Sequence, residues 1–344
     1  MWAMIVKEFR QVRRDHRTLA MMIVMPVVLL VVFGYAASFD TAEIPAIVGG
    51  PGAAAVADRL PDLFDVREVD AGVDRAAGIE LLRRGEAVVV ILADADRPVA
   101  LVDGSQLFSA RAAVQAMTAA GNVSMEVLFN PELDTSVVLV PGLAGLILLF
   151  IGTVITSLGV VRERQAGTLE QLAVMPLRPR DVFVGKVAPY FLVAAVDLVI
   201  VLVVGSLVFD VPFNGSVATL ALGSTLFLFV TLGVGVLISG VSENQGQAVQ
   251  LALMTLLPQV LLSGIIFPLE SMATAVRWIG YLLPLTWFNQ IARGVMVRGA
   301  PFSSLAFPLG ILAFSGVVVF GLAVVRFQRD LAASRSVEPV SVDA

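Results

Sequence analysis

The sequence predicts a polytopic α-helical membrane protein, with six transmembrane helices and an extracytoplasmic α/β domain between the first and the second. The chain has 344 residues, 58% of them hydrophobic, and a mean hydropathy of +0.89. Soluble domains are about 45–50% apolar, so a soluble core would not hide this much apolar surface. Several apolar runs also approach the ~20 residues that a helix needs to cross the hydrocarbon layer. Residues 39–137 differ, because they have the composition of an ordinary globular domain.

Residues 1–17 predict a cytoplasmic amphipathic helix. In the stretch MWAMIVKEFRQVRRDHR, apolar and basic side chains recur with helical spacing. Such a helix is suited to lie on a membrane surface. The apolar positions include Ile5 and Phe9, and the basic positions include Arg10 and Arg13.

Residues 18–38 follow as the first predicted transmembrane helix. A basic flank before an apolar run is also the pattern of a cleaved signal peptide, and Gly34, Tyr35 and Ala36 form a weak cleavage pattern. We favour a retained helix, because the run is long enough for a full span and no compact basic region precedes it.

Residues 39–137 predict an α/β domain. Strand-like runs alternate with helix-like runs, which is the pattern of a small α/β fold. The strand-like runs are residues 44–48, 64–69, 87–92 and 99–102, and the helix-like runs are residues 53–60, 74–83 and 106–129. Neither of the phosphate-binding patterns G-x-x-x-x-G-K-[ST] and G-x-G-x-x-G occurs here or elsewhere in the chain.

Five further apolar runs predict the remaining transmembrane helices. They are residues 138–161, 187–209, 217–240, 248–267 and 306–326. Residues 268–305 are partly apolar, but Pro268, Pro284 and Gly294 interrupt them. This segment is too short to cross the bilayer twice, so we predict a pair of re-entrant or interfacial helices on the extracytoplasmic side.

The basic residues predict the orientation, because short cytoplasmic loops are enriched in Lys and Arg. Residues 1–17 and the loop at 162–186 each hold five basic residues, and three more lie at the end of the last helix and in the tail at 327–344. Both termini and this loop are therefore predicted to be cytoplasmic. Arg277, Arg293 and Arg298 fall on the opposite side and run against the rule.

The composition also excludes several kinds of chemistry. The chain has no cysteine, which rules out disulfides, thiolate metal ligands and cysteine nucleophiles. The only histidine, His16, lies in a charged flank and is predicted to be solvated. The acidic residues show no paired carboxylates, catalytic triad or metal-ligand spacing. We therefore predict no catalytic residue, no metal site and no nucleic-acid partner.

Asp197 lies near the middle of the predicted helix at 187–209. Acids at this depth are costly and are therefore functional candidates. Asp197 is either a proton or cation site, or a structural group hydrogen-bonded to a neighbouring helix, and the lack of a basic residue at similar depth favours the structural role. The polar residues at 239–254 pose a similar choice, because they either line a dimer seam or vestibule or simply cap a helix.

The loop at 162–186 contains a short, sharply delimited helical segment, within the stretch RERQAGTLEQLAVMPLRPRDVFVGK. Thr168 and Gln171 form a capping box, and Pro176 prevents the helix from continuing. A helix this short is unstable alone, so its two-leucine face is predicted to dock on a cytoplasmic partner. The residues that define the segment are Gly167, Thr168, Leu169, Glu170, Gln171, Leu172 and Pro176.

The same stretch resembles the signature of ABC-2 type transporter permeases, approximately R-E-[RK]-x-x-G-T-x-E-x-L-x-x-[ST]-P-[LI]-x-x-x-x-[LF]-x-x-G-K. Met175 stands where the signature has Ser or Thr. Residues 101–113, 263–272 and 283–299 are similar to further segments of the larger-ectodomain members, so the resemblance covers nearly the whole chain. The positions that match the signature are Arg162, Glu163, Arg164, Gly167, Thr168, Glu170, Leu172, Pro176, Leu177, Phe183, Gly185 and Lys186.

The resemblance implies the permease subunit of an ABC exporter in a bacterial cell membrane. It implies a homo- or heterodimer of permeases, each docked on a separate ATPase subunit through the N-terminal helix and through a coupling helix in the loop at 162–186. ATP and Mg²⁺ would then be bound by the partner subunit, with no cofactor in this chain. The helices at 138–161 and 248–267 would line the path, and their scarcity of charge suits a hydrophobic or amphiphilic compound.

Two other functions stay open from the residues alone. The chain is alternatively a membrane-tethered sensor or assembly scaffold whose α/β domain binds a ligand. A proton-coupled carrier that uses Asp197 is a third reading, which is disfavoured because such carriers usually show repeat-related helices with several buried ionisable groups.

Overall fold

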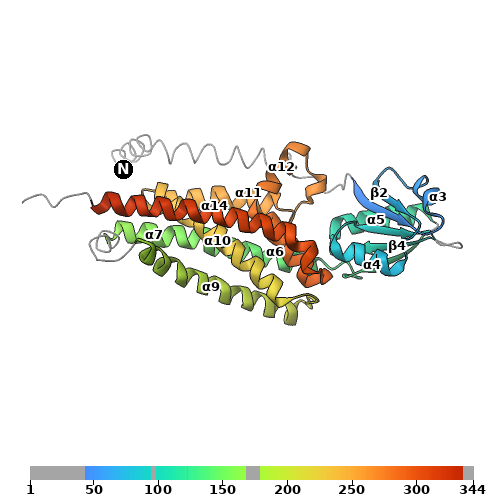
Figure 1. Ribbon diagram of the computed structural model, residues 1–344, viewed down its shortest axis with the longest axis horizontal. Helices are drawn as coiled ribbons and strands as arrows, with labels where there is room; N and C mark the ends of the chain where they lie inside the picture. Colours follow the sequence, from blue (N-terminus) through green and yellow to red (C-terminus); the bar gives the residue numbers. More distant parts are fainter. Residues whose placement is uncertain (1–42, 94–97, 122, 168–178, 336–344) are drawn as a thin grey trace, which may run out of the picture.

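The computed structural model describes residues 43–93, 98–121, 123–167 and 179–335. Figure 1 shows a five-stranded sheet and its helices at one end of a bundle of long helices. The predicted amphipathic helix at 1–17 and the first predicted transmembrane helix at 18–38 lie outside the described residues.

The sheet has the strand order β2-β1-β3-β4-β5. Its strands are β1 (Ile44–Gly49), β2 (Phe64–Asp70), β3 (Val89–Leu92), β4 (Val99–Asp103) and β5 (Ser124–Leu128). β1 pairs in parallel with β2 and β3, β3 pairs antiparallel with β4, and β4 pairs in parallel with β5. Every residue of β3 is buried, as expected for a central strand that is covered on both faces. The first four strands confirm the four that the sequence predicts.

Three helices pack on the sheet: α3 (Ala53–Ala57), α4 (Arg75–Arg84) and α5 (Leu107–Ala120). α4 begins where the side chain of Asp74 accepts a hydrogen bond of 2.8 Å from the backbone N–H of Ala77. It ends at Gly85, whose φ of 76° is a left-handed conformation that favours glycine. The helix predicted at 74–83 is therefore confirmed, and the helix predicted at 53–60 is shorter than expected.

The helix predicted at 106–129 is wrong in its second half. α5 ends at Ala120, and Gly121 has a φ of 80°, which turns the chain out of the helix. The chain then forms β5, which pairs with β4 from Ser124 to Leu128. This strand depends on the edge of β4, which lies more than twenty residues earlier in the chain, and local spacing of apolar residues does not reveal such a partner.

The bundle consists of the following helices. They are α6 (Thr135–Phe150), the π-helix η1 (Ile151–Ile155), α7 (Thr156–Gln165), α9 (Pro179–Val208), α10 (Val217–Val241), α11 (Gln245–Leu262), the 3₁₀-helix η2 (Leu269–Ser271), α12 (Thr274–Leu282), α13 (Pro284–Arg293), the π-helix η3 (Gly294–Arg298) and α14 (Phe302–Arg335). α6, η1 and α7 follow one another without a break, so they form one long helix.

Four segments of the described chain are long and apolar enough to cross a membrane. They are Thr135–Gln165, Ala188–Val208, Val217–Val241 and Phe302–Arg326. These segments coincide with the predicted helices at 138–161, 187–209, 217–240 and 306–326. A total of six spans, and the side on which the α/β part lies, stay predictions.

α11 differs from the transmembrane helix predicted at 248–267. It is not among the four segments above, because its glutamines lower its hydropathy. It also ends at Leu262, five residues before the predicted end. Gly264 has a φ of 79°, which turns the chain out of the helix before Pro268. The prediction placed the end too late because residues 263–267 are apolar enough to continue a helix.

The segment predicted as a helix pair contains α12, α13 and η3, so two helices are confirmed there. They differ in burial. In α12, Trp278 and Leu282 are largely exposed, whereas Leu285 and Phe288 of α13 are fully buried in the bundle. Among the described residues, α12 therefore presents an exposed apolar surface, whereas α13 belongs to the core.

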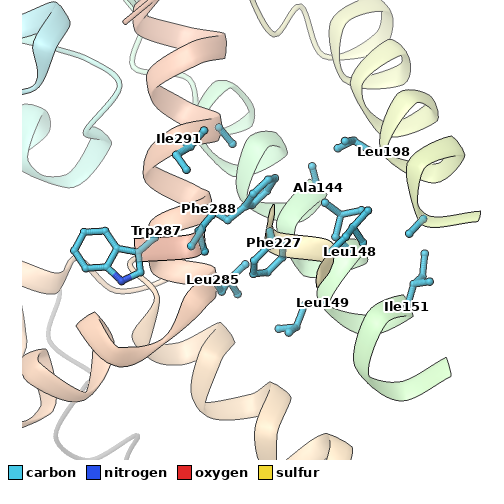
Figure 2. Close-up of a cluster of buried hydrophobic side chains, with 14 of the residues drawn as sticks. Ala144, Leu148, Leu149, Ile151, Leu198, Phe227, Leu285, Trp287, Phe288 and Ile291 are labelled. Atoms are coloured by element: carbon cyan, nitrogen blue, oxygen red, sulfur yellow. The ribbon is translucent and has the colours of Figure 1, made fainter. Parts of the chain in front are cut away.

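α10 lies at the centre of the bundle core. Its Phe227 stacks on Phe288 of α13, with ring centroids 4.7 Å apart. Figure 2 shows Leu148 and Leu149 of α6 next to this pair. α9 lies at the periphery, because most of its apolar side chains are exposed, Leu207 at 78%. α9 therefore offers its apolar side to lipid or to another protein.

Candidate functional site

The charged loop at 162–186 starts from the end of α7. Arg162, Glu163 and Arg164 lie in its last turns, and Gly167 follows with a φ of 71° and open space around its Cα. This conformation turns the chain sharply out of the helix. The structure thus shows how the loop begins. The other predicted coupling positions, Thr168, Leu169, Glu170, Gln171, Leu172 and Pro176, and the predicted docking positions Ile5, Phe9, Arg10 and Arg13 lie outside the described residues.

Arg164 connects the end of α7 to the end of α10. Its Nη1 donates hydrogen bonds to the carbonyl oxygens of Ser239 at 2.9 Å and Ser242 at 3.2 Å. The last carbonyls of a helix have no partner within the helix and carry partial negative charge, so a guanidinium is a favourable donor there. Any displacement of the start of the loop is therefore opposed by two charge-assisted bonds to α10.

The polar residues after α10 form a capped helix start. Asn244 accepts a hydrogen bond of 3.0 Å from the backbone N–H of Gln247, and the side chain of Gln247 accepts one of 2.9 Å from the backbone N–H of Glu243. This arrangement resembles a capping box, except that Gln247 accepts from the residue before the N-cap Asn244 instead of from the N-cap itself. Gln245 also donates from its side chain to that of Gln165 at 3.0 Å, which joins α11 to α7. Of the two roles left open for the polar residues at 239–254, the structure therefore shows the capping of a helix start.

A cavity of about 610 Å³ opens at this end of the bundle. Arg326 of α14 lies at its wall and donates a hydrogen bond of 3.2 Å to the carbonyl oxygen of Gly240. Four helices thus meet around one basic cavity: α7 and α10 at their ends, α11 near its start, and α14 at Arg326. The cavity is lined by Arg164, Gly240, Val241, Ser242, Glu243, Leu251 and Arg326.

The long helix formed by α6, η1 and α7 crosses α10 at very close range. A Cβ added to Gly152 would overlap the side chain of Thr231, and one added to Gly235 would overlap the carbonyl oxygen of Gly152. Gly152 lies within the π-helix, a widened turn that occurs often at functional sites. The two helices therefore contact each other backbone to backbone, at the point where the helical ladder is irregular.

A second cavity, of about 490 Å³, lies between α10, α11 and α14. Its wall is mostly apolar, with a few hydroxyl and amide groups such as those of Thr255 and Gln259. Both belong to α11, the helix that the family resemblance implies as part of a transport path. The lining residues are Leu149, Val230, Thr231, Val234, Met254, Thr255, Pro258, Gln259, Leu282, Leu283, Pro284, Phe314, Ser315, Val318 and Val319.

Asp197 lies on α9 and is partly exposed. Within the described part of the chain, no hydrogen bond or ion pair involves its carboxylate. The Ser or Thr partner that a structural role would require is therefore not found there, and both roles stay predictions.

Replacement of Asp197 by asparagine separates these roles. A proton-accepting carboxylate is required in each cycle of a proton-coupled carrier, so in that case Asp197→Asn abolishes transport. We expect transport to stay within about twofold of the wild type, because no ion pair or hydrogen bond links Asp197 to a second proton-carrying group among the described residues. The measurement is the initial rate of export from vesicles at pH 6 and pH 8.

The sequence did not predict the contacts of Arg164 and Arg326 with α10. Arg326 counted only as a basic residue that orients the chain, and Arg164 counted as an orienting charge and a position of the family signature. Their carbonyl partners lie 75 to 86 residues away. No group of three metal-ligating side chains occurs among the residues that the structure describes.

Comparison with known proteins identifies relatives that match most of the chain. The profile of the family described as "ABC-2 family transporter protein" matches residues 16–325. The "Probable multidrug ABC transporter permease YbhS" of Escherichia coli strain K12 is 28% identical over 366 aligned positions, which cover 96% of this chain and 97% of that protein.

Two further relatives match in part. The "Probable multidrug ABC transporter permease YbhR" of the same organism is 34% identical over 50% of this chain and 47% of its own length. The "Inner membrane transport permease YhhJ" of Escherichia coli strain K12 is 34% identical over 59% of this chain and 54% of its own length. No solved structure matches the chain. Because the family profile extends over most of its length, the chain belongs to the ABC-2 family of membrane transporter proteins.

Proposed function

We propose that the chain is the permease subunit of an ABC exporter, which moves an amphiphilic compound out of a bacterial cell while a separate subunit hydrolyses ATP. The observation that carries this proposal is the anchored end of α7. Arg164 bonds α7 to α10, and Gln165 bonds it to α11. A displacement of the charged loop would therefore be transmitted to both α10 and α11. The names of the relatives, which are permeases, support the same conclusion.

The docking surface on the ATPase side comprises the loop and the N-terminal helix. In the loop the proposed contacts run from Arg162 to Pro176, and in the helix they are Ile5, Phe9, Arg10 and Arg13. ATP and Mg²⁺ are bound by the partner subunit, and this chain contributes no nucleotide site. The sequence contains no phosphate-binding loop, which supports the assignment of ATP binding to the partner subunit.

The proposed orientation places both termini and the charged loop in the cytoplasm. The α/β part and the end of α7 lie at opposite ends of the bundle (Figure 1), so a cytoplasmic loop puts the α/β part outside. The excess of basic residues in the loop and at the termini supports the same direction.

The proposed compound is hydrophobic or amphiphilic. The cavity beside α11 has an apolar wall without charged residues, and burial of apolar surface is then the main source of affinity. We further propose that two permease copies, identical or homologous, enclose the path. The exposed apolar surface of α9 is available for lipid or for such a copy.

A transport assay tests this function. The chain is reconstituted into vesicles with an ABC-type ATPase from a neighbouring reading frame of its genome, and export of a panel of lipophilic cations, lipophilic anions and neutral drugs is measured. We expect export of at least one amphiphile that requires ATP and stops when the catalytic lysine of the ATPase is replaced. Export driven by a proton gradient without ATP would contradict the proposal, and so would ligand binding without any transport.

A further inference from the structure

The region where the α/β part meets the membrane helices contains a cavity of about 230 Å³. It lies between the N-terminal turn of α5, the end of α11 and the continuous helix formed by α13 and η3. Two arginines and several small polar groups face it. The lining residues that the argument uses are Ser105, Ser263, Glu270, Gln290, Arg293 and Arg298.

Arg298 is buried with incomplete pairing. Its side chain is 12% exposed, and its Nη1 lies 3.5 Å from Oδ2 of Asp103, which is fully buried. Neither that oxygen nor Nε of Arg298 has a hydrogen-bond partner within the described chain. Oδ1 of Asp103 is already engaged, because it accepts a hydrogen bond of 2.9 Å from the backbone N–H of Ser105. Burial of a charged donor without full pairing is costly, so an additional acceptor would be favourable.

Arg293 adds a second guanidinium to the same cavity. Its Nη2 is bonded only weakly, to the carbonyl oxygen of Gly264 at 3.4 Å. Burial and the neighbouring Arg298 lower its pKa to about 10, so it remains protonated at neutral pH. No carboxylate lies within ion-pair distance of Arg293 among the described residues. A site between two such groups suits a single anion that accepts from both.

The other groups of the cavity agree with an anionic occupant. The hydroxyl of Ser263 is buried and has no hydrogen-bond partner in the described chain. Glu270 is the acidic residue of the lining, and its carbonyl oxygen accepts from the guanidinium of Arg277. Among the residues that line the cavity, the two arginines outnumber the one carboxylate, that of Glu270, and Asp103 contacts Arg298 from outside this lining.

The position of the cavity indicates where the anion comes from. Val138, in the first turn of the apolar segment Thr135–Gln165, lines the cavity, as does Ile265 just after α11. The neighbouring α12 exposes Trp278 at 67%, and this ring packs edge-on against Tyr281 with centroids 6.1 Å apart. Exposed tryptophan and tyrosine are typical of the headgroup layer of a bilayer. The arginines therefore lie at the depth of lipid headgroups.

We propose that this cavity binds the phosphate or carboxylate headgroup of a membrane-borne anionic amphiphile, held between Arg293 and Arg298. Guanidinium groups bind such anions with two parallel charge-assisted hydrogen bonds, which a lysine does not reproduce. Asp103 competes with the ligand for Arg298. We therefore expect the site to bind an anionic headgroup more tightly than a zwitterionic one, whose positive group the two arginines would repel.

Calorimetry on the full-length protein in a neutral detergent tests the proposal without the ATPase and without transport. The probe is dihexanoyl phosphatidic acid, compared with dihexanoyl phosphatidylcholine and with inorganic phosphate. We expect the phosphatidic acid to bind at least tenfold more tightly than either. Equal binding of the zwitterionic lipid would overturn the proposal, and equal binding of inorganic phosphate would overturn the membrane origin of the ligand.

Variants identify the residues. Arg293→Gln and Arg298→Gln should each weaken binding at least tenfold, Arg293→Lys should weaken it less, and Asp103→Asn should strengthen it. The exposed Arg59 on the α/β part provides the matched control, since Arg59→Gln should leave affinity unchanged. Unaltered binding in both Arg293→Lys and Arg293→Gln would refute the site even if Arg298→Gln failed to fold. Failure here would leave the exporter function standing, because no transport is measured.

Discussion

Replacement of Gly235 by alanine is expected to destabilise the bundle by about 1–3 kcal/mol, the usual cost of overpacking a tight core. The added Cβ would overlap the carbonyl oxygen of Gly152 and lie 3.0 Å from that of Thr153. Both neighbours are backbone atoms of η1, so no side-chain rotation relieves the overlap. α10 and η1 must move apart, and the packing around them loosens. The measurement is the thermal unfolding midpoint of the purified protein in detergent.

Gly310 on α14 is the matched control for this substitution. Nothing lies within 4 Å of a Cβ added there, so Gly310→Ala meets no neighbour. Alanine in a helix interior is favoured over glycine by roughly 0.5–1 kcal/mol, so this variant should be as stable as the wild type or more so. Equal midpoints for Gly235→Ala and the wild type would show that the backbone-to-backbone crossing is wrong.

Replacement of Arg164 by alanine is expected to reduce ATP-dependent export at least tenfold while the ATPase stays bound. The variant loses both charge-assisted hydrogen bonds to α10, each worth about 1.5–3 kcal/mol, and frees the start of the loop from that helix. Arg164 is only one of the proposed contacts, and the segment from Gly167 to Pro176 and the N-terminal helix are unchanged. We therefore expect association to persist while movement is no longer transmitted. The measurements are the export rate and the ATP hydrolysis rate of the reconstituted complex.

Arg164→Lys is the informative companion variant. A lysine keeps the positive charge near the end of α10 but lacks the planar fork, so export should fall by less than in the alanine variant. If Arg164→Ala exported at the wild-type rate, the hydrogen bonds of Arg164 to α10 would not couple ATP hydrolysis to transport. That result would remove the main structural support for the proposed function.

Much of the fold follows from local sequence patterns. The long helices appear as uninterrupted apolar runs, and the start of α4 is marked by Asp74 and its end by Gly85. Strands β1 to β4 are short runs of apolar or β-branched residues that are bounded by turns. These features need only neighbouring residues, so periodicity and capping chemistry are sufficient to predict them.

The features that sequence reasoning missed depend on contacts between distant segments. β5 forms because β4 offers a free edge, although its own residues also fit a helix. Arg298 lies on the side that the distribution of basic residues predicts to be extracytoplasmic, and so runs against that rule. The structure shows its guanidinium beside Asp103, where the α/β part meets the helix bundle. This discrepancy could have predicted a buried ion pair, because an arginine on the side that is poor in basic residues is more readily explained by a specific acidic partner. Nothing in the sequence indicated which carboxylate it would find.

The central claim is that the loop at 162–186 docks a separate ATPase, and co-purification tests it most directly. Leu172→Asp places a charge on the proposed apolar face, and Glu170→Lys reverses a charge beside it. Glu132→Lys, an equal charge reversal on an exposed residue at the opposite end of the bundle, serves as the control. We predict that the wild type and Glu132→Lys retain the ATPase on an affinity column, whereas Leu172→Asp and Glu170→Lys lose it. Full retention by both loop variants would contradict the account.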